Sequence, residues 1–325
     1  MTPAGGANQA TRAPLDPKLS AMLAKLADLP DLSTLPVAEV RSGFKWRNPD
    51  GLRIDAVARV EDLPPNDRLP IALRLYRPQG EPPFPVLVFF HGSGFVACDL
   101  DTHDPMCRNL CAGSGYLVVS VDYRLSPEHK FPAAIDDALA ATRWVEERAG
   151  DFGGDPARIV VGGDSAGGNL GAVTALRARD DRRPRLAGQL LIYPVTDHYS
   201  ARHASYAQNA VGCGLTADTM RWFWDHYLND PSEAPRQEAS PLRAVDLSGL
   251  PPAMVLTAEY DVLRDEGRQY AERLAAAGVD VVWSHSRCLH HGFLFFPGVI
   301  DGVSEALDEA CAWLRSLARP GRPTG

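Results

Sequence analysis

Residues 162–168 read GGDSAGG and place Ser165 between small residues on both sides. The run RIVVGG (158–163) before it is continuously apolar, as in a buried strand, and NLGAVTALRAR after it has the pattern of a helix. A serine on a sharp turn between a strand and a helix is presented at the end of the strand, where it can act as a nucleophile. The same pattern occurs by chance in flexible loops. The strand before Ser165 and the helix after it favour the nucleophile.

A serine hydroxyl needs a histidine base, which in turn needs a carboxylate to orient it. After a serine turn of this kind, the acid and the histidine follow in that order. Asp261 comes directly after the apolar run AMVLTAEY (253–260), and His291 follows the run DVVWSH (280–285). We therefore predict that Ser165, Asp261 and His291 form a catalytic triad.

Neighbouring residues offer alternatives for both partners of the serine. Asp265 and Glu266 fall one turn into the next predicted helix, where acidic side chains interact favourably with the helix dipole. His290 is the rival base. His291 is preferred because Gly292 after it allows a tight loop turn.

Residues 91–95 read HGSGF and follow the apolar run PVLVFF (85–90). The tetrahedral intermediate of acyl transfer needs N–H groups that already point at the developing oxyanion. Glycines on both sides of Ser93, at Gly92 and Gly94, would let backbone N–H groups point inward, and the N–H of Ala166 would be a further donor. Alone, HGSG could be an ordinary strand-to-loop turn. Its place two strands before Ser165 predicts an oxyanion loop.

Short apolar runs alternate with helical patterns along the chain. Runs that are apolar on both faces indicate strands covered by helices on both sides, and hence a mostly parallel sheet. Two alternating segments before them indicate half-buried strands at an antiparallel end of the sheet. We predict an α/β fold with a mostly parallel eight-stranded sheet flanked by helices. The predicted strands are 53–60, 69–76, 85–90, 116–123, 158–163, 188–193, 253–260 and 280–285, and the predicted helices are 133–148, 166–179, 262–277 and 302–317.

Two further segments show helical character. Asp16 and Pro17 form a capping signal before an amphipathic helix. Residues 198–248 contain no predicted strand, and within them Met220, Phe223, Trp224 and Tyr227 form an apolar helical stripe. These helices either pack onto the core or form a lid over an active site.

Composition and charge exclude several classes of protein. The 325 residues are 45% hydrophobic and 23% charged, as in folded globular chains, and the net charge of −8 gives no basic field for nucleic acid. We see neither an apolar stretch of about 20 residues nor a signal-peptide pattern, and so expect a cytoplasmic protein that does not bind membranes. Six cysteines without paired spacing are expected to be reduced thiols, and we expect no metal site.

Four motifs together resemble one family: HGSGF, DYRLSPEHKFPAA (122–134), GDSAGG, and the pair YDVLRDEG and HGF. The set is similar to the hormone-sensitive-lipase-like branch of the α/β-hydrolases, the bacterial esterases of the GDSAG type, over roughly residues 70–300. The resemblance implies a serine carboxylesterase for small esters with short or medium acyl chains, an α/β-hydrolase fold with a helical cap, and no cofactor.

Carried over by position, the resemblance makes Ser165 the nucleophile, Asp261 the acid and His291 the base, with backbone donors at Ser93, Gly94 and Ala166. It also implies a division of the chain and supports for the wall of the site. The division is an N-terminal arm with cap helices (1–45), the first part of the core (46–197), a second cap segment (198–245) and the second part of the core (246–325). The wall residues would be His91, Tyr123, Arg124, Glu128 and His129.

Two positions depart from the family pattern. The loop usually reads HGGG, and Ser93 here replaces a glycine. The backbone N–H of Ser93 stays in place as a donor if the local φ is negative. The acid motif usually reads DPLRDE, and Val262 here replaces the proline. We expect a less rigid turn with Asp261 still in position.

Three other functions are alternatives to ester hydrolysis: a binding protein that has lost catalysis, an amidase or peptidase, and a lipase acting on oil droplets. All three triad residue types are present, no large gating domain fits in the chain, and no long apolar surface segment is evident. Candidate substrate-binding residues are Phe95, Phe223 and Trp224. A predicted edge strand at 280–285 could pair two copies in a homodimer.

Overall fold

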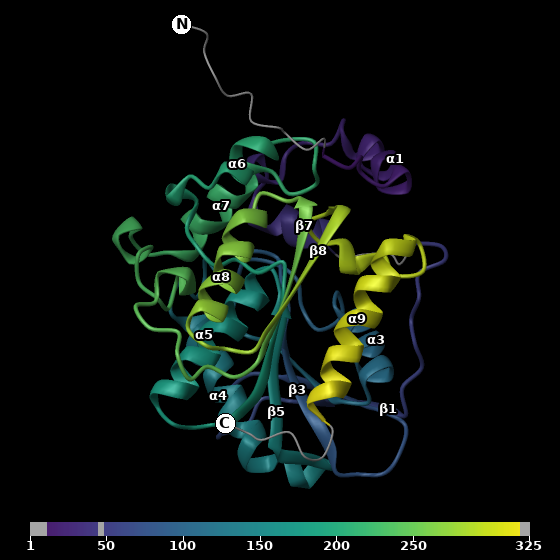
Figure 1. Ribbon diagram of the computed structural model, residues 1–325, viewed down its shortest axis with the longest axis vertical. Helices are drawn as coiled ribbons and strands as arrows, with labels where there is room; N and C mark the ends of the chain where they lie inside the picture. Colours follow the sequence, from purple (N-terminus) through teal and green to yellow (C-terminus); the bar gives the residue numbers. More distant parts are fainter. Residues whose placement is uncertain (1–11, 45–48, 319–325) are drawn as a thin grey trace, which may run out of the picture.

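The computed structural model describes residues 12–44 and 49–318 and builds them around one eight-stranded sheet (Figure 1). The strand order is β1-β2-β4-β3-β5-β6-β7-β8. Strand β2 is antiparallel to β1 and β4, and the other neighbouring pairs are parallel. The predicted mostly parallel sheet is confirmed. Its strands are β1 (Arg59–Leu63), β2 (Leu73–Arg77), β3 (Phe84–Phe90), β4 (Leu117–Val121), β5 (Gly154–Asp164), β6 (Leu186–Ile192), β7 (Ala253–Tyr260) and β8 (Val281–His290).

Helices cover both faces of the sheet (Figure 1). Alternate residues of a strand point to opposite faces. In β3, Val86 and Val88 belong to one buried cluster and Leu87 and Phe89 to the other, so both faces of this strand are in the core. This explains why the central strands are apolar at every position. The first face carries α4 (Ala133–Arg148), α5 (Ala166–Asp180) and α8 (Arg264–Ala276); the second carries α3 (Asp104–Ser114) and α9 (Asp301–Leu317).

The antiparallel end of the sheet differs from the prediction. The strand expected at 53–60 begins at Arg59 instead, and residues 53–55 contact other elements. The N–H of Arg53 donates to the carbonyl of Pro297, and the N–H of Asp55 donates to Asn109 Oδ1 on α3 (2.8 Å in each case). The predicted strand therefore begins too early in the chain. At residues 53–55, hydrogen bonds to distant residues replace sheet pairing. Helix α3 was not among the predicted helices.

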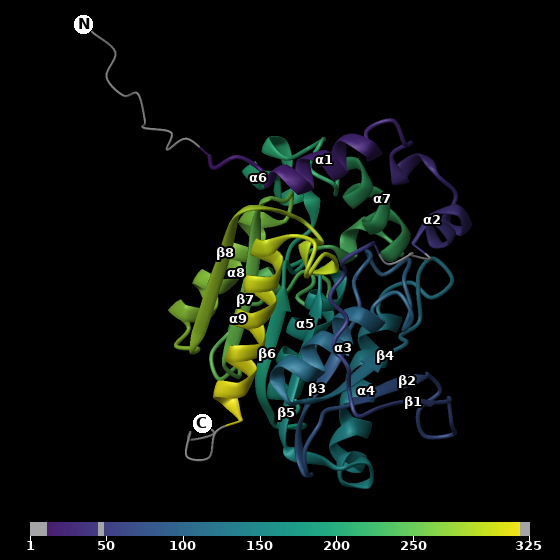
Figure 2. The ribbon, with the colours of Figure 1, turned by 90° about the vertical axis from the view of Figure 1, so that its right-hand side faces the viewer.

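The helices predicted outside the core lie together beyond the carboxyl ends of the parallel strands (Figure 2). Helix α1 (Pro17–Leu26) begins as predicted, with Asp16 accepting from the N–H groups of Lys18 and Leu19. The predicted stripe lies on α7 (Ala217–Tyr227) and is buried. Asp31 joins the two segments, since its carboxylate accepts from the hydroxyls of Thr216 and Thr219 (2.6 and 2.9 Å). The remaining elements are η1 (Leu32–Thr34), α2 (Val37–Gly43), η2 (Ala149–Phe152), η3 (Tyr199–Ala201), α6 (Ala204–Gln208), η4 (Pro231–Glu233), η5 (Pro241–Arg243) and η6 (Phe293–Phe295).

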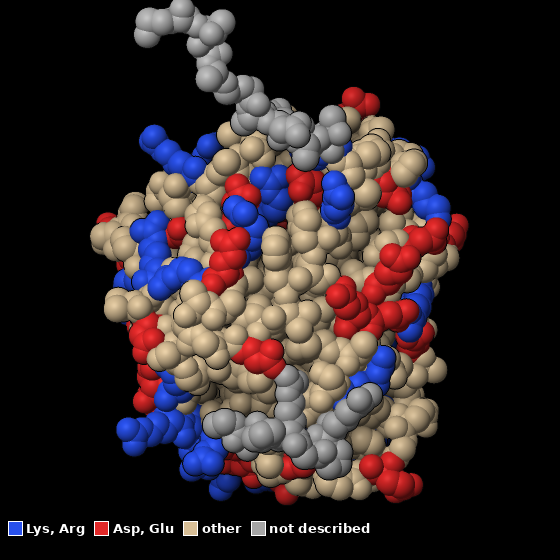
Figure 3. Space-filling view, in the orientation of Figure 1, with Lys and Arg blue, Asp and Glu red and all other residues tan. Residues whose placement is uncertain are grey.

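Strand β8 forms one edge of the sheet, with Val282 and Trp283 exposed to 39% and 43%. The face that includes this edge is largely free of charged side chains in its centre (Figure 3). A homodimer formed through β8 remains a prediction. Within the described ranges, no helix combines the length and the apolar character that crossing a membrane would require.

Candidate active site

Ser165 lies on a sharp turn between β5 and α5, with φ 55° and ψ −117°. This backbone conformation is unfavourable for a residue with a side chain and is typical of the nucleophile turn. The turn also presses the backbone against β3. A Cβ at Gly163 would lie 2.2 Å from the Phe90 carbonyl oxygen, and one at Gly167 would lie 1.8 Å from it. Both positions therefore require glycine.

The structure brings Ser165, His291 and Asp261 into one hydrogen-bonded chain. His291 Nε2 lies 2.9 Å from Ser165 Oγ, and His291 Nδ1 lies 2.8 Å from Asp261 Oδ2. A carboxylate can only accept, so Nδ1 carries the proton and Nε2 is free to accept the serine proton. Each residue comes from the carboxyl end of a strand: Ser165 follows β5, Asp261 follows β7, and His291 follows β8.

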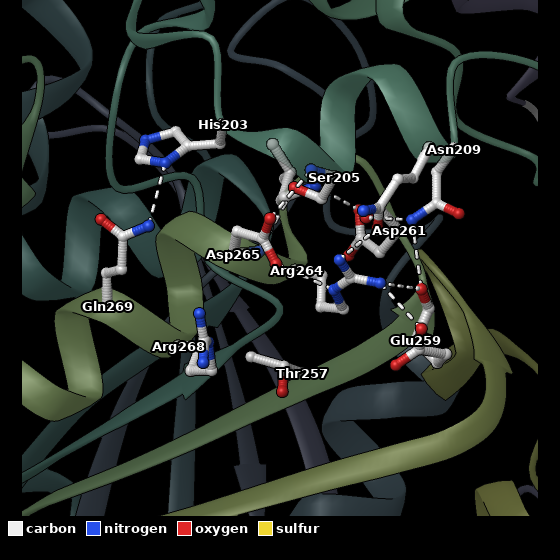
Figure 4. A network of polar contacts seen from close by, with 12 residues as sticks. His203, Ser205, Asn209, Thr257, Glu259, Asp261, Arg264, Asp265, Arg268 and Gln269 are labelled. Carbon is white, nitrogen blue, oxygen red and sulfur yellow. Dashed lines mark hydrogen bonds and ion pairs between the residues drawn. The ribbon is translucent and has the colours of Figure 1, made fainter. Parts of the chain in front are cut away.

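Asp261 is 1% exposed and is fixed on both sides by hydrogen bonds (Figure 4). Its Oδ1 accepts from the N–H of Leu263 at 2.8 Å. Asn209 Nδ2 donates to the carbonyl oxygens of Asp261 (2.8 Å) and Glu259 (3.1 Å) and so ties α6 to the end of β7. Val262, at the position where the family that the motifs resemble has proline, is fully buried. The acid is thus held in place by side-chain and backbone donors.

The two alternative acids have other partners. Asp265 pairs with Arg264 (2.9 Å) and accepts from the N–H of Ser205 (2.9 Å), as Figure 4 shows. Glu266 is fully buried and accepts from the N–H groups of Thr196 and Asp197. Burial raises the pKa of Glu266 well above its usual range. Both carboxyls hold loops around the site, and His291 pairs with Asp261.

The HGSGF loop runs from the end of β3 and has a left-handed backbone, with φ 76° at Ser93, 62° at Gly94 and 64° at Phe95. We expected the backbone N–H of Ser93 to stay in the donor position if φ is negative. The structure has a positive φ at Ser93, so this condition is not met. A Cβ at Gly92 would lie 2.5 Å from Asp164 Oδ2, and one at Gly94 would lie 2.1 Å from the ring of Phe223. The loop is thus wedged between the serine turn and α7, which leaves no room for side chains at either glycine.

A buried polar pair supports this loop from below. His103 Nε2 lies 3.1 Å from Asp164 Oδ1, and the N–H of Gly92 donates to the same ring nitrogen at 3.4 Å. Both side chains are buried, and Asp164 directly precedes Ser165. His103 was not predicted from the sequence. It lies outside the sequence motifs described above. Its position before α3 places it under the HGSGF loop.

The residues implied as wall supports separate into two groups. His91 stacks on Tyr123 with ring centroids 4.3 Å apart, and the Tyr123 hydroxyl donates to the His91 carbonyl at 2.7 Å. Burial and the neighbouring His103 lower the pKa of His91 to about 4. The other group lies farther out: Arg124 pairs with Asp137, Glu128 pairs with Arg41 of α2, and His129 is exposed.

A cavity of about 650 Å³ contains Ser165 and His291 in its wall, which is a usual volume for a small-molecule site. Most of its lining is apolar and comes from α1, η1, α7 and the loop after β8. Phe223 lines it, and its role in substrate binding stays a prediction. Phe95 and Trp224, also predicted to bind substrate, are not in its lining. Phe95 stacks on Tyr227 with ring centroids 3.8 Å apart, and Trp224 packs beside it, because the side of α7 that carries Trp224 and Tyr227 faces the core.

Within the described residues, no group of three or more His, Cys, Asp or Glu side chains is arranged to hold a metal ion. All six cysteines are free thiols. Burial raises the pKa of Cys98, beside the cavity, to about 12. This thiol is therefore protonated at neutral pH and is a poor nucleophile.

Comparison with known proteins gives consistent matches. A family described by its alpha/beta hydrolase fold matches residues 87–295. Esterase LipI of Mycobacterium tuberculosis is 45% identical over 250 residues, covering 76% of this chain and 78% of LipI. Carboxylesterase NlhH of the same species is 47% identical over 236 residues, covering 71% and 73%. Among solved structures, the hyperthermophilic esterase of the archaeon Pyrobaculum calidifontis superimposes with a TM-score of 0.86 at 40% identity, covering 94% of this chain and 99% of that one.

Proposed function

The chain belongs to the hormone-sensitive-lipase-like family of carboxylesterases within the α/β-hydrolases, and on that premise we propose that it hydrolyses short- to medium-chain acyl esters through Ser165, His291 and Asp261. It is a carboxylic ester hydrolase. The observation that carries the proposed triad is the pair of hydrogen bonds from Ser165 to His291 (2.9 Å) and from His291 to Asp261 (2.8 Å).

In the first step, Ser165 Oγ attacks the ester carbonyl carbon while its proton moves to His291 Nε2. The imidazolium that forms is stabilised by Asp261, whose carboxylate stays ionised. The tetrahedral intermediate then collapses. The bond to the alcohol oxygen breaks, and the alcohol leaves with the proton that His291 returns to it, which produces an acyl-enzyme on Ser165.

The oxyanion is stabilised by backbone N–H groups of the HGSG loop, at Ser93 and Gly94, and by the N–H of Ala166, whereas the N–H of Gly92 donates to His103. The Ala166 N–H lies in the first turn of α5, where backbone donors have no intrahelical partner. Ser93 and Gly94 line the same cavity as Ser165, which supports the assignment. Each such donor contributes on the order of 3 kcal/mol of transition-state stabilisation.

In the second step, His291 removes a proton from a water molecule, which attacks the acyl carbon. The bond to Ser165 Oγ breaks, the serine recovers its proton from His291, and the carboxylic acid is released. These steps use side chains, backbone N–H groups and water, without a cofactor.

We assign the cap role to the segments 1–45 and 198–245, of which residues 1–11 and 45 lie outside the described residues. We assign the core to 46–197 and 246–325, of which residues 46–48 and 319–325 lie outside the described residues. Met22, Leu32 and Phe223 from the cap segments line the cavity over Ser165. Its volume of about 650 Å³ and its apolar lining suit an acyl chain of short or medium length.

The test is a rate series over nitrophenyl esters of increasing chain length. We expect turnover by the unmodified chain to fall once the acyl chain outgrows the cavity, and Ser165→Ala to abolish turnover while circular dichroism shows a retained fold. Ser248→Ala, at an exposed serine, is the matched control. Unchanged turnover in Ser165→Ala would refute the proposed nucleophile.

A further inference from the structure

His290 lies beside the proposed base, and its side chain forms part of the cavity wall. The residue is 6% exposed and ends strand β8. Its ring meets Phe296 edge-on, with centroids 6.0 Å apart. Across the cavity wall are Gly214 and Leu23: a Cβ built on Gly214 would lie 3.9 Å from His290 Cδ2 and 3.7 Å from Leu23 Cδ2. The imidazole is thus enclosed by apolar groups.

The tautomer of His290 follows from its backbone contact. His290 Nδ1 forms a hydrogen bond with the carbonyl oxygen of His291, which can only accept, so Nδ1 carries a proton. Burial lowers the pKa of His290 below its usual range, so the ring is neutral at physiological pH. In a neutral imidazole protonated at Nδ1, Nε2 is a hydrogen-bond acceptor.

No residue in the described ranges 12–44 and 49–318 donates a hydrogen bond to His290 Nε2. Ser93 Oγ and Asp164 Oδ1, on two other residues of the wall, have no hydrogen-bond partner within the described ranges, but both atoms are closed to solvent. Ser165 and His291 bond to each other, and the Thr219 hydroxyl donates to Asp31. His290 Nε2 is not among the fully buried atoms that lack a partner, so this acceptor is open to the cavity. A ligand that brings a hydroxyl to this position would form a hydrogen bond that a plain ester cannot form.

We propose that His290 is a specificity-determining residue whose Nε2 accepts a hydrogen bond from a hydroxyl group on the substrate, so that the enzyme prefers hydroxylated esters to plain esters of equal length. This inference rests on the proposed function, because it uses the same cavity and the same reaction. The hydroxyl could be carried on the acyl chain or on the alcohol, and both sources present the same donor.

Two substrate series separate these sources. The first compares nitrophenyl esters of hydroxyalkanoic acids, with the hydroxyl at successive carbons, against the plain ester of the same chain. The second compares diol monoesters with the corresponding alkyl esters. The readout is the ratio of kcat/KM for the hydroxylated ester to that for the plain one. We expect a ratio of about ten at one hydroxyl position in one of the series, as for a single well-placed hydrogen bond.

The variants test whether His290 is the cause. His290→Leu should bring the ratio to about one, and His290→Gln, whose side-chain oxygen can still accept, should retain part of the preference. Leu23→Ala reshapes the same part of the cavity without touching the acceptor and should leave the preference in place. A merely structural role of His290 would lower kcat/KM for both esters alike and keep their ratio, which would overturn the inference. An unmodified enzyme without preference at any position in either series would also overturn it.

Binding to a Ser165→Ala protein, measured by calorimetry, makes the test independent of turnover. Tighter binding of the hydroxylated ester, lost on adding His290→Leu, supports the role of His290 whether or not Ser165 is the nucleophile. Equal binding of both esters contradicts it. Full turnover by Ser165→Ala would refute the triad alone.

Discussion

Gly94 lies so close to Phe223 that a Cβ at position 94 would come within 2.1 Å of the phenyl ring. The first residue belongs to the loop that we assign to the oxyanion hole, and the second to helix α7. The contact therefore joins the site of charge stabilisation directly to the cap. Any displacement of α7 must act on the loop, and any side chain on the loop must displace α7.

Gly94→Ala is expected to lower kcat/KM by about 10² to 10³, the usual effect of losing one oxyanion donor, because the methyl group forces the loop away from Phe223. The measurement is steady-state hydrolysis of a short nitrophenyl ester. Gly278→Ala is the matched control, since its φ of 84° carries the same backbone strain while nothing lies within 4 Å of the added Cβ. The double variant Gly94→Ala with Phe223→Ala should regain part of the activity. Failure of the ring deletion to help would assign the loss to backbone strain instead of the clash.

Asp261→Asn should reduce kcat about 10⁴-fold with little change in the fold, because an amide no longer holds His291 with its proton on Nδ1. Single-turnover kinetics on a nitrophenyl ester would measure the acylation step directly. Asp265→Asn changes a neighbouring carboxyl that pairs with Arg264, and it should cost less than about tenfold. Equal losses in the two variants would contradict the assignment of the acid.

The positions of the proposed catalytic residues could be read from the sequence because each follows a strand whose apolar run is unmistakable. A parallel sheet brings the carboxyl ends of its strands to one edge, so Ser165, Asp261 and His291 had to lie near one another once the strands were recognised. Contacts between side chains far apart in the sequence could not be read in this way. His103 under the loop and Phe95 behind α7 owe their roles to packing, which leaves no periodic signal in the chain.

The strand limits at the antiparallel end were missed for a related reason. Alternation of apolar and polar residues indicates a two-sided environment but does not say what provides it. Residues 53–55 find their partners in Asn109 of α3 and in Pro297. Local pattern therefore predicted the central strands well, because burial on both faces constrains every residue there, and it predicted the periphery less well.

His103→Leu should lower the free energy of unfolding by about 3 kcal/mol, because it leaves the buried N–H of Gly92 without its acceptor and places an apolar side chain against the buried carboxylate of Asp164. Urea denaturation followed by tryptophan fluorescence would measure this change. Adding Asp164→Asn removes the uncompensated charge and should recover at least half of the loss. If the single variant changes stability by less than about 1 kcal/mol, the pair is not a significant support of the loop.

Glu266→Gln should stabilise the protein increasingly as the pH rises. Burial raises the pKa of Glu266 well above its usual range, and the nearby carboxylates of Asp197 and Asp261 act in the same direction. The folded chain therefore keeps a proton on this carboxyl above the pH at which the unfolded chain releases it. The corresponding stability is fully present below the unfolded pKa and decreases by about 1.4 kcal/mol per pH unit up to the folded pKa.

Glutamine mimics the protonated carboxyl without this linkage, and its side-chain oxygen can accept the same hydrogen bonds from the N–H groups of Thr196 (2.8 Å) and Asp197 (3.2 Å). The two proteins should thus have similar melting temperatures near pH 5, and the variant should melt at the higher temperature at pH 8. Thermal unfolding across this range, followed by circular dichroism, tests the expectation. A melting-temperature difference that stays constant with pH would mean that Glu266 is ionised in the folded chain, and its two backbone donors would then outweigh the cost of its burial.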